Sequence, residues 1–200
     1  MFTYHLAEAF VFALIGGLLY AIARLIYLLV QRKKAEDKIN WGRELLLLVF
    51  AAYIAAVCSQ TILPIFSFGI DSGTGKFFFH AGLLGSRSLN LVPFRTILEF
   101  LSPYDSTMAR VDWGVFRAMN LLMNLVLFLP FGFLLPVLWD KFRSFKRTVL
   151  LAVCLIIAIE SVQYFIGRSC DIDDLILNAL GTALGYGIYC VLHKIRSARK

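Results

Sequence analysis

Charged residues are scarce in this chain: 16% of its 200 residues are Asp, Glu, Lys or Arg, whereas 60% are hydrophobic. A soluble globular domain has roughly a quarter of its residues charged. The mean hydropathy of +0.76 also points to a chain that lies mostly in lipid. The composition therefore excludes an ordinary soluble domain and predicts an integral membrane protein.

Residue types that form common catalytic and metal centres are also few. The chain has only three histidines and no Ser/His or Cys/His arrangement for nucleophilic catalysis. Its four cysteines show no CxxC spacing, so we interpret them as small apolar side chains. The run Asp171-x-Asp173-Asp174 is too short for an EF-hand loop. We therefore predict no metal ion and no cofactor.

Long hydrophobic runs are abundant, and five of them are long enough to cross a bilayer. The first has neither the basic segment nor the Ala-x-Ala site of a cleaved signal peptide, so we expect it to be retained. We predict an all-α polytopic bundle in the cell membrane, with spans at about 6–30, 45–66, 118–139, 148–167 and 175–192. Its predicted divisions are a first helix with a basic loop, a main transmembrane domain and a basic tail, over residues 1–44, 45–193 and 194–200.

The basic residues predict how the chain crosses the membrane. Thirteen Lys and Arg fall in the first loop, the third loop and the tail, whereas the long connection 67–117 has five over a much greater length. The last loop has only Arg168. Because Lys and Arg concentrate in cytoplasmic loops, we predict the N-terminus outside and the C-terminus in the cytoplasm. The net charge of +7 is thereby explained without a nucleic-acid partner.

Two parts of the chain are expected to depart from long regular helices. The long connection opens with a glycine-rich segment, Phe68–Gly75, followed by Phe77–Phe79. A connection of this length is either functional or partly helical at the membrane surface, and Thr96–Leu101 is amphipathic enough for a short interfacial helix. In the third span, Pro130 and Gly132 predict a kink, because proline leaves the carbonyl four residues back without a donor.

Polar side chains on four predicted spans fall at one depth. At about 1.5 Å per helical residue, Gln60, Asn124, Glu160 and Asn178 all lie within about 10 Å of the predicted outer boundary. Such residues are either hydrogen-bonding partners between helices or the wall of a polar site. For four charged residues together we favour the site, because an acid in a lipid-spanning segment is costly and by default functional: Glu160, Arg168, Asp171 and Asp174.

The most polar stretch joins the fourth and fifth predicted spans. Glu160 and Gln163 are three residues apart and share one helix face. Asp173 lies at a helix start, where we expect it to cap the free N–H groups of its own helix. A second shared face follows from offsets of 0, 3, 7, 10 and 14 in Asp171, Asp174, Asn178, Gly181 and Gly185. The two glycines predict close helix packing.

These residues resemble the VanZ-like family of bacterial membrane proteins. The resemblance covers about residues 90–185, and the founding member of the family lowers susceptibility to teicoplanin without altering cell-wall precursors. It implies a protein of the bacterial cell envelope and does not establish a reaction. Three blocks carry it: Asn90-x-x-Pro93-Phe94; Asn124 with Pro130-Phe-Gly-Phe-Leu-Leu-Pro136; and Glu160-x-x-Gln163 with Arg168-x-x-Asp171-x-x-Asp174-x-x-x-Asn178.

One predicted function is binding without catalysis. The ligand would be a membrane lipid, a lipid-linked cell-wall precursor or a glycopeptide antibiotic, held in a polar cavity of the outer leaflet. We expect Glu160 to be ionised beside Arg168 in this site. The predicted ligand-binding residues are Asn90, Pro93, Phe94, Asn124, Glu160, Gln163, Arg168, Asp171, Asp174 and Asn178.

Two other functions stay open. An outer-leaflet enzyme acting on a lipid-linked head group would use Glu160 as a general base and Arg168 to hold a phosphate. In this alternative the aspartates, with Asp171 and Asp174 as further catalytic candidates, would bind a divalent cation, although the sequence signal for a metal is weak. A transporter is less favoured, because five spans without a visible internal repeat do not fit the usual architecture of transporters.

Overall fold

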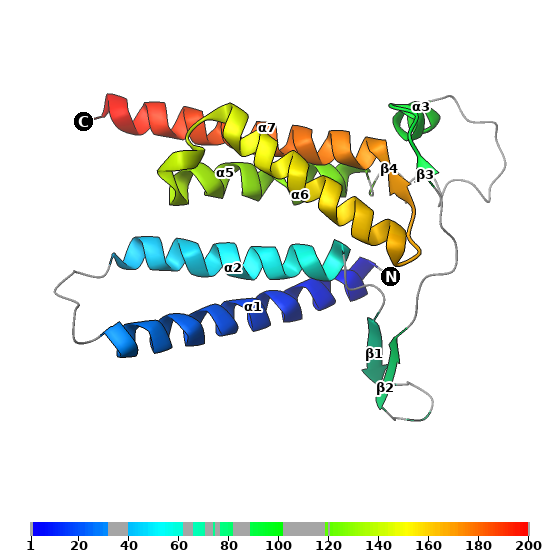
Figure 1. Ribbon diagram of the computed structural model, residues 1–200, viewed down its shortest axis with the longest axis horizontal. Helices are drawn as coiled ribbons and strands as arrows, with labels where there is room; N and C mark the ends of the chain where they lie inside the picture. The colour runs from blue at the N-terminus through cyan, green and yellow to red at the C-terminus, as the bar shows by residue number, and fades with distance from the viewer. Residues whose placement is uncertain are drawn as a thin grey trace. The chain divides into compact units, whose positions relative to one another are not determined.

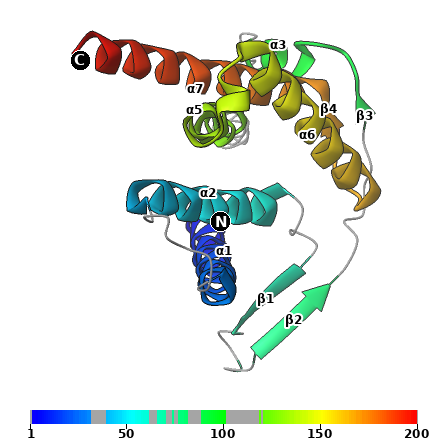
Figure 2. The same ribbon diagram turned by 60° about the vertical axis from the view of Figure 1, so that its left-hand side comes forward.

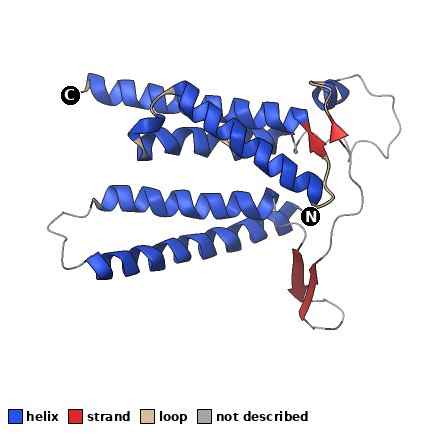
Figure 3. Ribbon diagram, in the orientation of Figure 1, coloured by secondary structure: helices blue, strands red, loops and turns tan. Residues whose placement is uncertain are grey.

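The computed structural model describes residues 2–31, 40–61, 66–70, 74, 77–81, 89–101, 119 and 121–199. Five helices are long and apolar enough to cross a membrane, which confirms the predicted all-α membrane bundle. Helices make up most of the described chain, and its few strands are short (Figure 3). The chain forms two compact units, Met1–Leu83 and Leu84–Lys200, which are described in turn.

The first unit is a helical hairpin followed by a β-hairpin. Helices α1 (Phe2–Gln31) and α2 (Trp41–Thr61) pack along each other (Figure 1). Strand β1 (Phe66–Ile70) pairs antiparallel with β2 (Phe77–Ala81). The β-hairpin was missed in the sequence, although apolar residues alternate along β1 as they do in strands.

A bidentate ion pair joins the two long helices of the first unit. The guanidinium of Arg24 on α1 contacts both carboxylate oxygens of Glu44 on α2, with Nε at 2.8 Å from Oε2 and Nη2 at 2.5 Å from Oε1. The Tyr20 hydroxyl also donates to Oε2, at 3.1 Å. Because lipid cannot solvate either charge, the pair satisfies both groups within the hairpin.

The second unit contains the three remaining spans. They are Leu121–Leu138, whose latter part is α5 (Leu129–Leu138), then α6 (Phe145–Phe165) and α7 (Ile172–Ala198). A short 3-10 helix, η3 (Asp140–Phe142), links α5 to α6. Helix α7 packs against both α5 and α6 (Figures 1 and 2). The most buried apolar side chains lie at these contacts: Phe128, Phe131, Leu135, Ala152 and Ile156.

Glycines allow the third span and α7 to approach closely. A Cβ on Gly181 would fall on the carbonyl oxygen of Leu125, and one on Gly185 would fall on that of Leu129. From the other helix, a Cβ on Gly132 would meet the carbonyl oxygen of Thr182. The predicted small-residue packing of Gly181 and Gly185 is therefore present, and no larger side chain fits at these positions without a backbone shift.

The third span is interrupted where a kink is predicted. Helical structure breaks at Phe128, and Pro130 lies in the first turn of α5, where a missing N–H is harmless. The Gly132 N–H still donates to the Phe128 carbonyl, at 3.1 Å. Pro130 thus begins a new helix, whereas Gly132 serves close packing against Thr182 rather than the bend.

One end of the second unit brings distant parts of the sequence together. Strand β3 (Leu89–Asn90) pairs parallel with β4 (Cys170–Asp171), and α3 (Arg95–Leu101) contacts α7. Figure 1 shows these elements where α6 finishes and α7 begins. The short helix predicted at Thr96–Leu101 is therefore present as α3. The pairing places the Asn90 block directly against the aspartate run.

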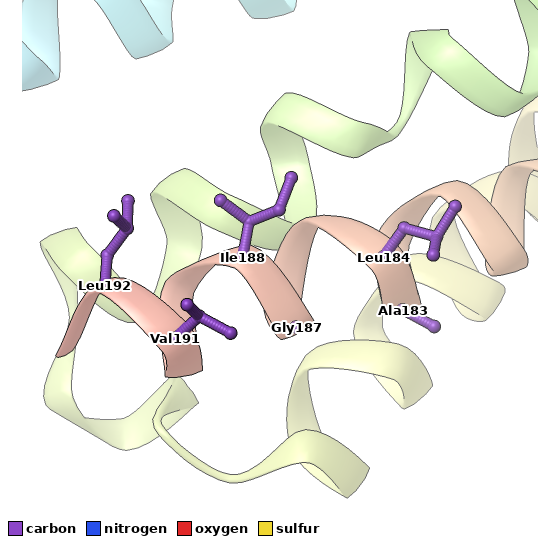
Figure 4. A pocket seen from close by; sticks show the side chains of 6 residues that line it. All are labelled: Ala183, Leu184, Gly187, Ile188, Val191 and Leu192. Carbon is purple, nitrogen blue, oxygen red and sulfur yellow. The ribbon is translucent and has the colours of Figure 1, made fainter. Parts of the chain in front are cut away.

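The opposite part of α7 carries a shallow apolar groove. Its side chains are exposed aliphatic groups with no polar atoms, which suits contact with lipid tails or another apolar helix and no chemistry (Figure 4). The lining residues are Ala183, Leu184, Gly187, Ile188, Val191 and Leu192.

Candidate ligand-binding site

A glycine turn after α6 sets the position of Arg168. Gly167 adopts a φ of 88°, a left-handed conformation that glycine takes without steric cost. Its N–H donates to the Tyr164 carbonyl at 3.2 Å, and the Arg168 N–H donates to the Gln163 carbonyl at 2.9 Å. These two bonds form a Schellman motif, which ends the helix and reverses the chain. Arg168 is thereby held close to the last turns of α6.

Asp171 begins α7 and ties it to the Asn90 block. Its Oδ1 accepts from the Asp173 N–H at 2.9 Å, which makes Asp171 the N-cap of α7. The same oxygen accepts from Asn90 Nδ2 at 3.1 Å, and Oδ2 accepts from the Thr96 hydroxyl at 2.6 Å. The carboxylate is therefore occupied by bonds that hold the two segments together.

Asp173 caps a different helix from the one predicted. Its side chain is fully buried, with 0% exposed. It accepts from the backbone N–H groups of Phe94 at 2.5 Å, Thr96 at 2.8 Å and Ile97 at 3.2 Å. These are free donors at the start of α3. The prediction that Asp173 caps α7 is wrong, because an N-cap side chain must precede the first turn, and Asp171 holds that place.

The same contacts hold Phe94 in an unusual backbone conformation. Phe94 has a φ of 64°, which costs about 1–2 kcal/mol for a residue with a Cβ. Its hydrogen bond to Asp173 offsets this cost. Both Pro93 and Phe94 are exposed, with 52% of Phe94 accessible. We call the hydrogen-bonded set Asn90, Thr96, Asp171 and Asp173 the latch.

Glu160 lies buried in the last part of α6, with 8% of its surface exposed. Its carboxylate is within hydrogen-bonding reach of the Cys170 thiol and the Asp171 N–H, and it feels the charge of Arg168. Its Oε2, however, has no hydrogen-bond partner among the residues the structure describes. A buried carboxylate oxygen without a donor is rare and costly.

Asp174 lies near Glu160, in the first turn of α7. The amide Nδ2 of Asn124, on the third span, donates to Asp174 Oδ1. The Asp174 carboxylate also interacts electrostatically with Glu160 and Arg168. Asn178, one turn further along and only 5% exposed, has an Oδ1 that finds no donor within the described part of the chain. Two buried acceptor atoms on facing helices are therefore unsatisfied.

Burial and neighbouring charges shift the pKa values of two side chains in the loop between α6 and α7. Burial lowers the pKa of the Arg168 guanidinium, and the charges of Glu160 and Asp174 oppose this effect. Burial and the neighbouring Glu160 carboxylate raise the pKa of the Cys170 thiol to about 11. Cys170 is therefore a neutral S–H donor at physiological pH, whereas Arg168 supplies the positive charge that faces the two acids.

A family model described as VanZ/LLP1 matches residues 50–193. The chain belongs to this family. No curated protein and no solved structure matches it. The matched range runs from α2 into α7 and includes the latch and every residue of the candidate site, so the resemblance drawn from the three sequence blocks is confirmed.

Most of the predicted site residues of this VanZ/LLP1 chain belong either to the latch and its edge or to a second set, whereas Gln163 and the predicted polar residue Gln60 belong to neither. Asn90 and Asp171 belong to the latch, and Pro93 and Phe94 form its exposed edge. Gln163 is buried on α6, one turn from Glu160. Gln60 lies in the first unit, where its amide donates to Ser59 Oγ at 3.2 Å. The others form what we call the polar cluster: Asn124, Glu160, Arg168, Asp174 and Asn178, joined by Cys170.

Two neighbours of the candidate site, Thr96 and Cys170, are not predicted from the sequence. Thr96 gave no signal because a threonine at a helix start usually caps its own helix, whereas here it donates to a carboxylate 75 residues away. Cys170 was interpreted as an apolar filler, yet it lies beside Glu160. In the described ranges, no three His, Cys, Asp or Glu side chains are placed to hold a metal ion.

Proposed function

We propose that this VanZ-like membrane protein binds the polar part of a membrane lipid, a lipid-linked cell-wall precursor or a glycopeptide antibiotic in the polar cluster. Binding there would lower susceptibility to teicoplanin. The supporting observation is the pair of unsatisfied acceptors, Glu160 Oε2 and Asn178 Oδ1. A buried polar atom is almost always paired, so an unpaired carboxylate inside a span is best explained by a ligand that donates to it.

The surroundings of the cluster support a lipid-like ligand. It lies where α6 finishes and α7 begins, at one end of two membrane spans. The predicted orientation assigns this end to the outer leaflet. The latch holds an apolar edge beside it, with more than half of each side chain exposed in Leu91, Val92, Phe94 and Leu98. Such an edge would contact acyl chains while the cluster holds the head group.

A second candidate is an enzyme that acts on a lipid-linked head group. The observation in its favour is that Arg168 faces both Glu160 and Asp174, while Asn124 orients Asp174. A positioned carboxylate can act as a general base, and a guanidinium can stabilise negative charge that develops in a transition state. Conversion of a lipid by the purified protein, absent in Glu160→Gln, would favour this function over binding alone.

The decisive experiment compares variants at matched membrane abundance. We expect Glu160→Gln to abolish both the retention of lipid by the purified protein and any tolerance to teicoplanin, because it removes the charge. Glu160→Asp should keep part of both. The matched control is Asp140→Asn, which changes an exposed acid. Full retention and full tolerance in both Glu160 variants would make Glu160 a packing residue and contradict the proposal.

A further inference from the structure

We infer that the group held between Glu160 and Asn178 is a primary ammonium, carried by a lipid head group or by a peptidic amine. This inference rests on the proposed function and names the chemical class of its ligand. It follows from the kind of atoms left unpaired, from the local charge and from the donors already in use.

Both unpaired atoms are acceptors. An ionised carboxylate has no hydrogen to donate, and an amide oxygen only accepts. A phosphate or sulfate also offers acceptors only, so it would leave Glu160 Oε2 and Asn178 Oδ1 unsatisfied. A ligand must bring at least two N–H or O–H donors to satisfy both, and a primary ammonium brings three.

The charge of the cluster also favours an ammonium group. The carboxylates of Asp171 and Asp173 are occupied by the latch. When Glu160 and Asp174 are both ionised, two carboxylates of the described cluster face the guanidinium of Arg168. A bound cation would stabilise that ionised state inside the span, whereas an anion would oppose it. A neutral hydroxyl would supply donors without this stabilisation.

Donors in the described part of the chain do not pair with these two oxygens. The Cys170 thiol and the Asp171 N–H already reach the Glu160 carboxylate, and Asn124 donates to Asp174. Among the described residues nothing reaches Oε2 or the Asn178 oxygen. A quaternary ammonium would supply charge but no N–H, so the site should discriminate between a primary and a trimethylated amine.

The test uses the purified full-length chain and lipids with identical acyl chains. Native mass spectrometry measures the retention of phosphatidylethanolamine, phosphatidylcholine and phosphatidylglycerol, which supply a primary ammonium, a quaternary ammonium and hydroxyl groups respectively. We expect phosphatidylethanolamine to be retained at least about tenfold more strongly than either of the others. Competition with soluble lysine methyl ester separates the two sources: displacement of the lipid assigns the site to peptidic amines as well, and no displacement restricts it to lipid.

Variants assign the preference to the two acceptors. Glu160→Gln should remove it, and Asn178→Leu should weaken it. Asn178→Asp should keep it, because aspartate offers the same acceptor and more negative charge. Loss of the preference in Asn178→Asp would mean that Asn178 donates to Glu160, which overturns the inference. Asp140→Asn is the control, and thermal melting establishes that each variant is folded.

The outcomes separate this inference from the function on which it rests. Equal retention of phosphatidylglycerol and phosphatidylethanolamine, with loss of both in Glu160→Gln, would overturn the ammonium and leave head-group binding in place. Equal retention of all three lipids by the wild type and by Glu160→Gln would overturn head-group binding itself.

Discussion

Asp171, Asp173 and Asp174 have three different roles. The donors that lie near each carboxylate determine its role. Asp171 stands before the first turn of α7 and caps it. Asp173 points to the start of α3 and receives its backbone donors. Asp174 points into the bundle, toward Asn124. A carboxylate that accepts several N–H bonds is structural, whereas one that faces other charges across a span is a candidate for ligand binding.

The latch predicts a specific loss of stability in Asp173→Asn. The amide keeps one acceptor oxygen but replaces the other with a donor, which must then face an N–H group of α3. At least one charge-assisted bond is lost, so we expect about 1–3 kcal/mol of destabilisation. Chemical denaturation in detergent measures this, with Asp140→Asn as the exposed control. Equal stability of the two variants would contradict the structural role of Asp173.

Cys170 reports the electrostatics of the cluster through its reactivity. With a pKa of about 11, the thiol stays almost entirely neutral at pH 8. Its rate of reaction with a maleimide should rise with pH and reach half its maximum only near pH 11, since the thiolate is the nucleophile. Glu160→Gln removes a negative charge that raises this pKa, so it should shift the profile to lower pH. The measurement uses a variant in which the other three cysteines are alanine. A half-maximal rate near pH 8.5 in both proteins would be inconsistent with Glu160 lying beside the thiol.

At the scale of elements, hydrophobicity alone predicts the five spans, because each run must be apolar to lie in lipid. The short elements at the membrane end depend on contacts far apart in the sequence. Helix α3 was predicted from its amphipathic pattern, but nothing local shows that Asp173, 77 residues from Thr96, supplies its cap. For the polar cluster, helical spacing predicts which residues share a helix face. It does not predict which of their atoms remain unpaired, because that depends on contacts between helices.

Glycines on α7 provide a matched pair for testing the helix contact. A Cβ on Gly185 would fall on the Leu129 carbonyl oxygen, whereas one on Gly187, half a turn away, would meet nothing within 4 Å. We expect Gly185→Ala to destabilise the protein by about 1–3 kcal/mol through overpacking. Gly187→Ala should be neutral or stabilise by up to about 1 kcal/mol, because alanine is the better helix former. Thermal melts of the two variants in the same detergent decide, and equal melting temperatures would exclude the tight contact at Gly185.

The ion pair of the first unit predicts a reciprocal rescue. Either Arg24→Leu or Glu44→Leu leaves one charge unpaired in a span, so each should lower the amount of protein in the membrane. The double variant, Arg24→Leu with Glu44→Leu, leaves no unpaired charge and should recover much of the loss. Quantitative immunoblotting of membranes provides the readout. Additive losses in the double variant would mean that the pair does not join α1 to α2.

At the scale of the whole molecule, orientation determines what the polar cluster can meet. If all five apolar helices cross the membrane, the two termini lie on opposite sides, and the loop between α6 and α7 lies on the side of the N-terminus. Lys and Arg gather in the first loop, the third loop and the tail. With those segments in the cytoplasm, as we predict, the cluster would lie in the outer leaflet, where an extracellular antibiotic would reach it.

Single cysteines at Ser72, Ser106 and Ser197 test this orientation in a background in which the native cysteines are alanine. A membrane-impermeant thiol reagent should label the first two positions in intact cells, because they lie in the long connection with few basic residues. It should label Ser197→Cys only after lysis, since the tail is basic. The protein without cysteines is the control for background. Labelling of Ser197→Cys in intact cells would place the cluster in the inner leaflet. Head-group binding would then remain open, but direct contact with an extracellular glycopeptide would not.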